Sequence, residues 1–369
     1  MVKKALYEEA GGLDEGFAVS LNDVDFCLKL REMGYLNVFT PFAELYHYES
    51  ISRGLDTDGA KAARYNEESA KFREKWKQLL EEGPVFAPCV YDCLSAKITE
   101  QAGFKAMCLS GGELAASYCG LPDIGLVSLQ ELTDAVGRIS ASCPLPMIVD
   151  IDTGFGNELN VIHTCRKIAR AGAMAVHMED QTFPKRCGHL QGKEVIPLED
   201  YIGKVKAASY ALKDTDCLLI ARTDAYQILG KEAAIERAVA SVEAGAQITL
   251  VEGTQTLEAI EEIGRRVPGW KMFGMASAGA SPKVTYKQLV DWGYNLITVH
   301  CAQWGAIKGM EDFSKTCLET GGDSFITDRD DVDNRPIALF NMFGLQEWME
   351  LGRKFSPKIN EAKEFDTKS

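Results

Sequence analysis

From residue 84 onward, short apolar runs rich in β-forming residues alternate with longer segments whose apolar positions recur at helical spacing. Helical patterns lie between the runs, and glycine follows several of them, where a helix commonly ends. Eight such units in roughly 230 residues predict an α/β fold, a (β/α)8 TIM barrel. A doubly wound open sheet is the alternative, but no Gly-x-Gly-x-x-Gly motif opens a helix after the first strand. The predicted strands are 85–89, 105–109, 147–150, 174–178, 217–221, 247–251, 271–274 and 295–299. The clearest helical patterns are 159–171, 201–212, 231–244 and 286–292.

Two segments do not follow this alternation. Residues 1–83 contain a helix-like stretch at 23–33 and a charged helical pattern at 60–82. At the other end, a Gly/Asp-rich loop at 319–333 precedes a helical pattern at 337–355 with one apolar side. Such a helix is expected to cover either its own barrel or a partner's. We therefore expect a small partial α/β module (1–75), the barrel (76–320) and a C-terminal loop and helical extension (321–369).

Composition narrows the classes of function. The 369-residue chain is 46% hydrophobic and 25% charged, which is sufficient for a buried core. Its net charge of -14 argues against nucleic acid and against an anionic membrane as partners. No apolar stretch is long enough for a transmembrane helix, and no signal peptide is recognisable. The 11 cysteines show no Cys-x-x-Cys or zinc-type spacing, which indicates reduced thiols and a cytoplasmic protein.

Polar residues follow nearly every predicted strand. The active site of a TIM barrel lies at the carboxyl ends of its strands, so these residues are expected to meet there. Gly111 and Gly112 belong to a loop whose backbone N–H groups suit a carboxylate or phosphate, although a plain tight turn would explain them equally well. The candidates at this end are Tyr91, Ser110, Gly111, Gly112, Asp150, Asp152, Glu179, Lys185, Arg186, Cys187, Gly188, His189, Arg222 and Glu252.

Three of these acids form a candidate metal site. Asp150 and Asp152 lie two residues apart, so in a strand they point the same way, and Glu179 arrives from the next strand. Clustered carboxylates repel one another unless a cation lies between them. A helix cap or a salt bridge would explain any one acid alone, whereas three together favour a metal. An oxygen-only cluster suits Mg²⁺, with Mn²⁺ as the alternative.

Cys187 is the one cysteine in a chemically distinctive setting. Lys185, Arg186 and His189 surround it, and cationic neighbours lower the pKa of a thiol. The connection at 181–197 is long for such a barrel, and long loops of this kind often act as lids. The plainer interpretation is an exposed structural loop with an incidental thiol.

These segments resemble the isocitrate lyase / phosphoenolpyruvate mutase superfamily. The resemblance rests on residues 150–156, 177–181, 185–189 and 221–225, and the Lys-Arg-Cys-Gly-His run at 185–189 is similar to the signature of the lyase branch. It covers residues 75–320 and, more weakly, the C-terminal helix. It implies Mg²⁺-dependent cleavage of a carbon–carbon bond in a small anionic 2-hydroxy or 2-oxo di- or tricarboxylate. It also implies a homotetramer with an exchanged C-terminal helix.

The resemblance assigns roles to individual residues. Cys187 matches the acid that protonates the carbanion product, and Asp123 matches an active-site acid near the metal. Asp150 matches the direct metal ligand, with Asp152 and Glu179 acting mostly through water. The implied catalytic residues are Tyr91, Lys185, Cys187, Arg222 and Glu252. The implied substrate-binding residues are Ser110, Gly111, Gly112, Asp123, Arg186, Gly188 and His189.

Substrate identity is the open question within that superfamily. A 2-methylisocitrate or 2,3-dimethylmalate type substrate, giving pyruvate or a related oxo acid, is the leading expectation. Alternatives are an oxaloacetate hydrolase or decarboxylase, a carboxyphosphonoenolpyruvate mutase, and a catalytically silent scaffold. Three departures from the family pattern bear on this choice: Gly274 for Asn, Val299-His300 for a Tyr-Pro pair, and Gly305 for Arg.

The N-terminal segment resembles something else. Residues 11–15, 22–27 and 45–50 look like the C-terminal third of a family 2 glycosyltransferase of the rhamnosyltransferase-like kind. In that family the acid matching Asp23 activates the acceptor hydroxyl. The nucleotide-binding half that should precede this part is missing, so residues 1–75 are expected to be an inactive fragment.

Overall fold

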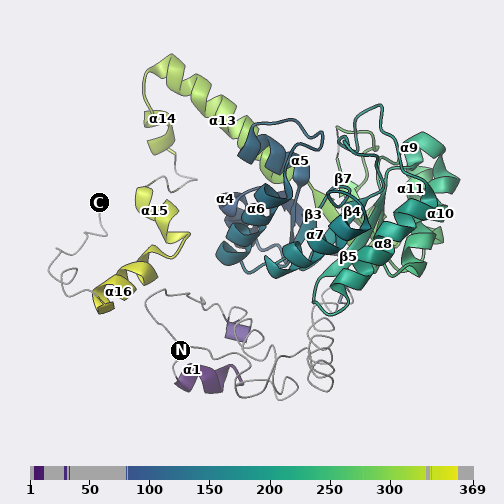
Figure 1. Cartoon of the computed structure of the whole chain (residues 1–369). Coiled ribbons are helices and arrows are strands. Elements are labelled where there is room, and N and C mark those ends of the chain that lie inside the picture. Colours follow the sequence, from purple (N-terminus) through teal and green to yellow (C-terminus); the bar gives the residue numbers. More distant parts are fainter. Residues whose placement is uncertain are drawn as a thin grey trace. The chain divides into compact units, whose positions relative to one another are not determined.

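Eight parallel strands form a closed barrel in which each strand pairs with its sequence neighbours and β1 pairs with β8 (Figure 1). The computed structural model describes residues 4–11, 29–30, 33, 80, 82–276, 278–329, 333 and 335–355. Each observed strand overlaps its predicted run, which confirms the (β/α)8 barrel, and the closed ring excludes a doubly wound sheet. The strands are β1 (Val85–Val90), β2 (Met107–Leu109), β3 (Met147–Asp150), β4 (Ala175–Glu179), β5 (Leu218–Thr223), β6 (Ile248–Val251), β7 (Trp270–Met275) and β8 (Leu296–Val299).

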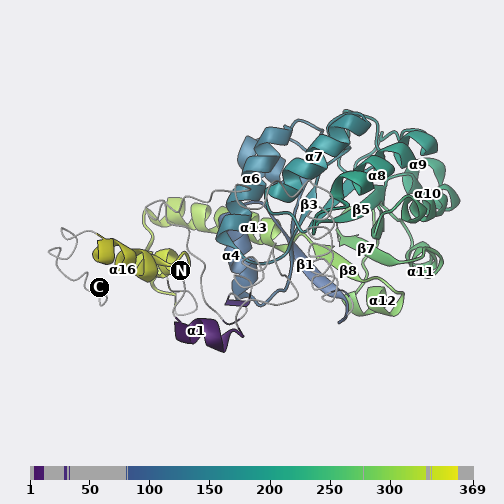
Figure 2. The same cartoon turned by 60° about the horizontal axis from the view of Figure 1, so that its bottom comes forward.

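Helices surround the strands (Figure 2). Helix α6 illustrates how the sequence builds them: Ser128 caps its first turn in a reciprocal pairing with Glu131, and its apolar stripe is buried. These helices and short turns of the barrel are α4 (Cys93–Gln101), α5 (Gly111–Leu114), the π-helix η1 (Ala115–Cys119), α6 (Leu129–Ser142), α7 (Glu158–Arg170), α8 (Leu198–Leu212), α9 (Tyr226–Leu229), α10 (Lys231–Glu243), α11 (Leu257–Arg266) and α12 (Tyr286–Asp291).

Alternation along the strands determines what enters the barrel. One buried cluster contains alternate strand residues, including Ile148, Ile220 and Leu250, in the manner of the layers that fill such barrels. Two residues further along the same strand faces come Asp150, Arg222 and Glu252. Because residues two apart share a face, these side chains project into the barrel mouth, the rim formed by the carboxyl ends of the strands.

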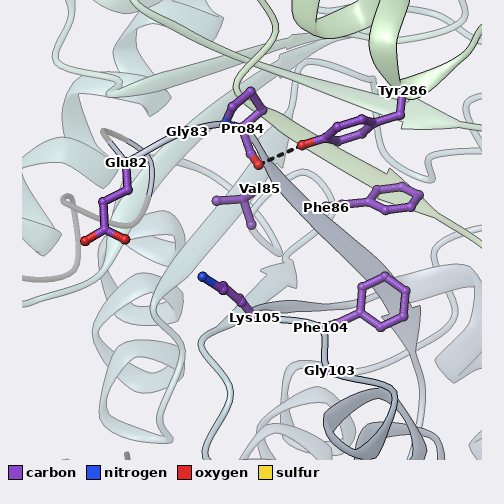
Figure 3. Close-up of a pocket in the computed structure, with 9 residues that line it drawn as sticks. All are labelled: Glu82, Gly83, Pro84, Val85, Phe86, Gly103, Phe104, Lys105 and Tyr286. Atoms are coloured by element: carbon purple, nitrogen blue, oxygen red, sulfur yellow. Dashed lines mark hydrogen bonds between the residues drawn. The ribbon is translucent and has the colours of Figure 1, made fainter.

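A cavity of about 250 Å³ lies at the opposite end of the barrel, where β1 begins. Figure 3 shows the ring of Tyr286 reaching across to Pro84, whose carbonyl accepts a hydrogen bond from the Tyr286 hydroxyl at 2.8 Å. Phe86, Phe104 and Lys105 line the same cavity. Because barrel enzymes react at the carboxyl ends of their strands, this cavity is not the candidate site.

The chain divides into two compact units, residues 1–302 and 303–369. This division falls earlier than the boundary at residue 320 that the pattern predicted, because α13 (Cys301–Thr320) buries none of its residues. The predicted loop at 319–333 contains a short helix, α14 (Ser324–Thr327). The single predicted helix at 337–355 is wrong: α15 (Pro336–Asn341) and α16 (Leu345–Phe355) are separated by a turn at Gly344, whose φ of 78° lies in the left-handed region.

Apart from residues 4–11, which contain α1 (Lys4–Glu9), and three others, residues 1–75 lie outside the described part of the chain. The glycosyltransferase-like fragment, including Asp23, therefore stays a prediction. Among the described residues, we find no helix that is both long and apolar enough to cross a membrane.

Candidate active site

Neighbouring strands bring an acidic and a basic side chain together at the barrel mouth. Glu179 ends β4 and is paired in register with Arg222 of β5. Arg222 Nη2 lies 3.1 Å from Glu179 Oε2, and both side chains are buried. Glu252, the first residue after β6, is buried beside them. The register of the sheet therefore creates this part of the site.

Asp152 lies at the site, but in a turn rather than in the strand that the sequence pattern predicted. Strand β3 ends at Asp150, and Asp152 lies in a turn with a left-handed φ of 48°, so the expected strand alternation does not apply to it. Its backbone N–H donates to Asp150 Oδ1 at 3.0 Å. Lys185 Nζ lies 2.8 Å from Asp152 Oδ1 and also bonds Asp123. A turn held by the Asp150 side chain thus keeps the two acids close together.

His177 was not predicted as a site residue. Its Nε2 lies 3.1 Å from Asp150 Oδ1, and the ring is buried. Burial lowers the pKa of His177, and the carboxylate of Asp150 opposes that effect. A signal was present in the sequence, because His177 lies two residues before Glu179 in β4 and so shares its inward face.

Burial and opposite charges compete throughout this cluster. Burial raises the pKa of Glu179 well above its usual range, although Arg222 acts in the other direction. Burial also raises the pKa of Asp152 to about 6 despite the nearby charge of Lys185. Burial opposes the charge of Lys185, but Asp152 and the other carboxylates outweigh it and raise the pKa of Lys185. The surrounding carboxylates therefore keep Lys185 charged, while burial raises the pKa of both Glu179 and Asp152.

The three predicted metal-binding acids have space beside them and keep carboxylate oxygens that lack hydrogen-bond partners in the described part of the chain. Glu179 Oε2 forms the ion pair with Arg222, but neither carboxylate oxygen of Glu179 accepts a hydrogen bond from the described residues. A Cβ at Gly111 would lie 3.2 Å from Asp150 Oδ2 and 3.4 Å from Asp152 Oδ1, so glycine keeps this side of the acids open. Carboxylate oxygens are the ligands that Mg²⁺ and Mn²⁺ prefer. The residues present therefore fit a hard divalent cation.

These acids do not form a closed cage. Among the described residues, the trio whose ligand atoms all lie within 4.8 Å of one another is Cys89, Glu113 and His300. Asp150, Asp152 and Glu179 are more widely spread and are partly engaged by basic side chains. Mg²⁺ commonly keeps several waters and uses one or two carboxylates together with its substrate. The open arrangement of these three acids is therefore compatible with Mg²⁺ that is coordinated partly by water and substrate.

The lid loop (residues 181–197) is anchored at its base. The Gln181 side chain accepts from the backbone N–H of Arg186 at 2.9 Å and donates to the carbonyl of the same residue at 2.8 Å. Thr182 N–H donates to the Glu194 carbonyl at 2.8 Å, and Ile196 N–H donates to the Asp180 carbonyl at 2.9 Å. These hydrogen bonds therefore hold the two ends of the loop together where it leaves and re-enters the barrel.

Cys187 lies in this loop, and its backbone N–H donates to the Asp123 carbonyl at 3.1 Å. Lys185 does lower the pKa of the thiol, as expected of a cationic neighbour, but the expected net decrease is wrong because burial outweighs it. Burial, with a further contribution from the Asp123 carboxylate, raises the pKa of Cys187. The thiol is therefore protonated at neutral pH, which is the form that donates a proton.

The next residues of the lid loop press directly on the site. A Cβ at Gly188 would lie 2.5 Å from Arg222 Nη2 and 2.6 Å from Glu252 Cγ, so the backbone there packs against both side chains. Buried Lys193, which was not predicted, bonds the Gly188 carbonyl and lies 2.8 Å from Asp224 Oδ1. Its position in the middle of a loop carried no sequence signal. These contacts hold the loop closed.

Of the remaining predicted residues, the structure brings one group to the barrel mouth and leaves Arg186 outside it. Ser110 caps the short helix α5, and Tyr91 follows the last residue of β1, so both lie at the barrel mouth. His189 Nδ1 accepts from the Ala280 N–H at 3.1 Å, and its Nε2 is 3.6 Å from Glu252 Oε1. Arg186 is exposed and donates to the Gln191 carbonyl at 3.1 Å, so the structure does not bring it into the cluster.

Asp123 and Gly112 also lie at the barrel mouth. A Cβ at Gly112 would lie 3.1 Å from Asp123 Oδ2, so the absence of a side chain permits this close approach. Two of the departures from the family pattern also border the site. A Cβ at Gly274 would lie 3.6 Å from Glu252 Oε2, and His300 Nδ1 lies 2.8 Å from Glu113 Oε1. Gly305 is part of the second unit.

Asp224 and Asp180 orient the side chain of Arg222. Asp224 accepts from Arg222 Nε at 2.8 Å and from Nη2 at 3.2 Å. Although burial opposes the charge on Asp224, Arg222 and Lys193 lower its pKa to about 2. Asp180 in turn accepts from the Asp224 N–H at 2.8 Å and from Arg237 at 2.9 Å. This buried network determines where the Arg222 guanidinium points.

Comparison with known proteins gives matches over the barrel. The model of the phosphoenolpyruvate phosphomutase family matches residues 76–317. The chain is 37% identical over 307 residues to the chloroplastic carboxyvinyl-carboxyphosphonate phosphorylmutase of Arabidopsis thaliana, covering 80% of this chain and 88% of that one. It is 40% identical over 278 residues to the 2-methylisocitrate lyase of Aeropyrum pernix (75% and 88%). It is 36% identical over 229 residues to the 2,3-dimethylmalate lyase of Eubacterium barkeri (62% and 79%).

Solved structures give the same grouping. An oxaloacetate acetylhydrolase bound to the inhibitor 3,3-difluorooxalacetate aligns with a TM-score of 0.72 and 31% identity, covering 77% of this chain and 96% of that one. A phosphonopyruvate hydrolase in complex with oxalate and Mg²⁺ aligns with a TM-score of 0.68 and 28% identity, covering 77% and 99%.

Proposed function

The chain belongs to the phosphoenolpyruvate phosphomutase family, within the phosphoenolpyruvate mutase / isocitrate lyase superfamily of enzymes, and from this premise we propose that it is a Mg²⁺-dependent carbon–carbon lyase. The proposed substrate is a small 2-hydroxy di- or tricarboxylate of the 2-methylisocitrate or 2,3-dimethylmalate type. The proposed products include pyruvate or a related oxo acid. The observation that carries this proposal is the position of Cys187 in a lid loop whose next residue, Gly188, packs against buried Arg222 and Glu252.

The charges of the site suit the intermediate of such a reaction. Cleavage of a carbon–carbon bond next to a carboxylate leaves an enolate-like anion, whose stabilisation is the main task of the site. Lys185 and Arg222 are buried cations within reach of the barrel mouth. A divalent cation, when bound at Asp150, Asp152 and Glu179, would add Lewis-acid stabilisation of the same charge.

The lid loop supports the second half of the reaction. Cys187 can deliver its proton to the carbanion carbon, which completes the release of the saturated product. Gly188 packed on Arg222 and Glu252 excludes water from that side, which prevents solvent from quenching the intermediate. Lys193 and His189 fasten the loop at two further points, on Asp224 and on Ala280.

The test is turnover by the full chain with Mg²⁺ of a panel containing 2-methylisocitrate, 2,3-dimethylmalate, isocitrate and oxaloacetate. We expect oxo-acid release from one of the first two substrates, loss of activity with a chelator, and recovery when Mg²⁺ returns. Cys187→Ser should abolish turnover while the protein still binds Mg²⁺ and oxalate in calorimetry. A fully active Cys187→Ser variant would exclude the proposed acid role.

Hydrolysis of oxaloacetate is the second candidate, supported by the structural likeness to oxaloacetate acetylhydrolase. Release of oxalate and acetate from oxaloacetate, without turnover of the other substrates, would favour it. A silent scaffold would give neither product and no heat with Mg²⁺ and oxalate. The expected homotetramer and cytoplasmic location stay predictions.

A further inference from the structure

A second cluster of metal-ligating side chains lies on another side of the barrel mouth. Cys89 comes from β1, Glu113 from α5 and His300 from the residue after β8. Their sulfur, carboxylate oxygen and ring nitrogen atoms all lie within 4.8 Å of one another. Strands β1 and β8 pair with Pro88 opposite Val299, so closure of the barrel brings the first and last of these residues together.

The cluster contains an unsatisfied buried acid. Glu113 is 2% exposed, and its Oε1 lies 2.8 Å from His300 Nδ1. Its other carboxylate oxygen, Oε2, is buried and has no hydrogen-bond partner among the described residues. A buried carboxylate oxygen without a partner is costly, and a cation is one of the groups that satisfies it. An ion pair of Glu113 with His300 would account for one oxygen and leave the other unexplained.

We propose that Cys89, Glu113 and His300 form a second metal site, for a borderline divalent cation such as Zn²⁺. A donor set of one thiolate, one imidazole and one carboxylate is typical of zinc and differs from the oxygen-only set that Mg²⁺ prefers. Three protein ligands leave the fourth tetrahedral position for water. The proposal goes beyond the proposed function, which uses Asp150, Asp152 and Glu179 for its cation.

The geometry needs only a small contraction. Zinc–ligand bonds of about 2.0–2.3 Å place tetrahedral ligand atoms about 3.5 Å apart, so atoms now within 4.8 Å must approach by up to about 1.3 Å. Cys89 is a thiol before binding, and it loses its proton to solvent as the sulfur–metal bond forms. His300 is the partly exposed member of the trio, so a cation can enter from its side.

Cobalt spectroscopy tests the proposal without reference to turnover. The full chain is stripped with a chelator, saturated with Mg²⁺ and titrated with Co²⁺ as a spectroscopic substitute for Zn²⁺. A thiolate ligand to Co²⁺ produces a near-ultraviolet charge-transfer band that oxygen ligands do not produce. We expect this band to saturate at one equivalent of Co²⁺, and we expect Zn²⁺ to abolish it by displacement.

Variants identify the ligands. Cys89→Ala should eliminate the band, and both His300→Ala and Glu113→Gln should weaken Zn²⁺ binding at least tenfold in competition with a chromophoric chelator. Cys187→Ala should keep the band, which excludes Co²⁺ bound near the oxygen-rich site. Cys165→Ala, which removes an equally buried cysteine on α7, should also keep it.

Two results would overturn the proposal. One is a wild-type protein that shows no charge-transfer band at saturating Co²⁺. The other is a band that persists in Cys89→Ala. If Cys89→Ala does not fold, unchanged Zn²⁺ affinity in His300→Ala would be equally decisive, because that side chain is partly exposed and its removal leaves the core intact.

Discussion

Replacing Gly188 by alanine tests whether the closed lid loop is the catalytic arrangement. The Gly188 backbone is not in the left-handed region, so alanine is compatible with its conformation. The obstacle is space, because the added Cβ would lie 2.5 Å from Arg222 Nη2 and 2.6 Å from Glu252 Cγ. Arg222 cannot move aside easily, since Asp224 and Glu179 both bind its guanidinium.

The size of the effect follows from these distances. An ordinary contact begins at 3.4 Å, so the loop must rise by about 0.9 Å at Gly188. Cys187 is the adjacent residue and moves with it. A misplacement of about 1 Å commonly costs about 100-fold in rate, which is about 2.7 kcal/mol in the activation barrier. We expect Gly188→Ala to lower kcat by about that factor with little change in Tm.

Two measurements check this expectation. The first is kcat on whichever substrate the wild-type enzyme cleaves. The second is the rate of Cys187 alkylation, which should increase because the raised loop exposes the thiol, and which needs no knowledge of the substrate. Leu190→Ala is the matched control in the same loop, since its side chain is exposed. Gly137→Ala is the control for the substitution, because no atom lies within 4 Å of its Cβ and helix α6 should gain about 0.5–1 kcal/mol.

A Gly188→Ala enzyme with kcat within threefold of wild type and unchanged alkylation would refute the reasoning. It would mean that the loop acts in catalysis from a position other than the closed one.

Three further predictions concern pH and stability. Because burial raises the pKa of Cys187, the alkaline limb of the pH–rate profile should lie above the ordinary thiol value of 9.0, and a limb below it would contradict the acid role. The pKa of Asp224 is about 2 in the fold against 3.8 ordinarily, so its charged form contributes about 2 kcal/mol above pH 4 that is lost as pH falls towards 2. Urea unfolding should show this loss in wild type and not in Asp224→Asn. Arg237→Met leaves buried Asp180 short of a partner and should cost about 3–5 kcal/mol of unfolding free energy, whereas Arg265→Met removes an exposed pair and should cost under about 1 kcal/mol.

The lid loop shows where prediction from sequence succeeds and where it stops. The run at 185–189 marked a chemically active loop, and the structure does place most of it on the site. Lys185 and Arg186 are adjacent and equally basic, yet only Lys185 is buried among the acids. A loop has no periodicity that tells which of two neighbours faces inward. The same limit explains why Lys193, a buried anchor, was not predicted.

The sign of a pKa shift is another quantity that the local sequence does not contain. Cationic neighbours of Cys187 suggested a lowered value, but burial and Asp123, 64 positions earlier in the chain, raise it. Desolvation depends on everything packed around a group, most of it distant in sequence. The proximity of Cys89 to Glu113 and His300 is likewise absent from the local sequence, because it arises only when β1 and β8 close the barrel.

The sequence by itself determined the eight strand–helix units, the polar residues after the strands and the family, because hydrophobic periodicity and short motifs are local properties of the chain. The tertiary structure decided which side chains face the barrel mouth, which charges are paired and how burial shifts each pKa. In the tertiary structure, the predicted C-terminal helix is interrupted at Gly344, and Asp152 lies outside the strand that ends at Asp150. The physical reason is that burial and charge pairing are set by contacts between distant segments, and those contacts arise only when the sheet closes.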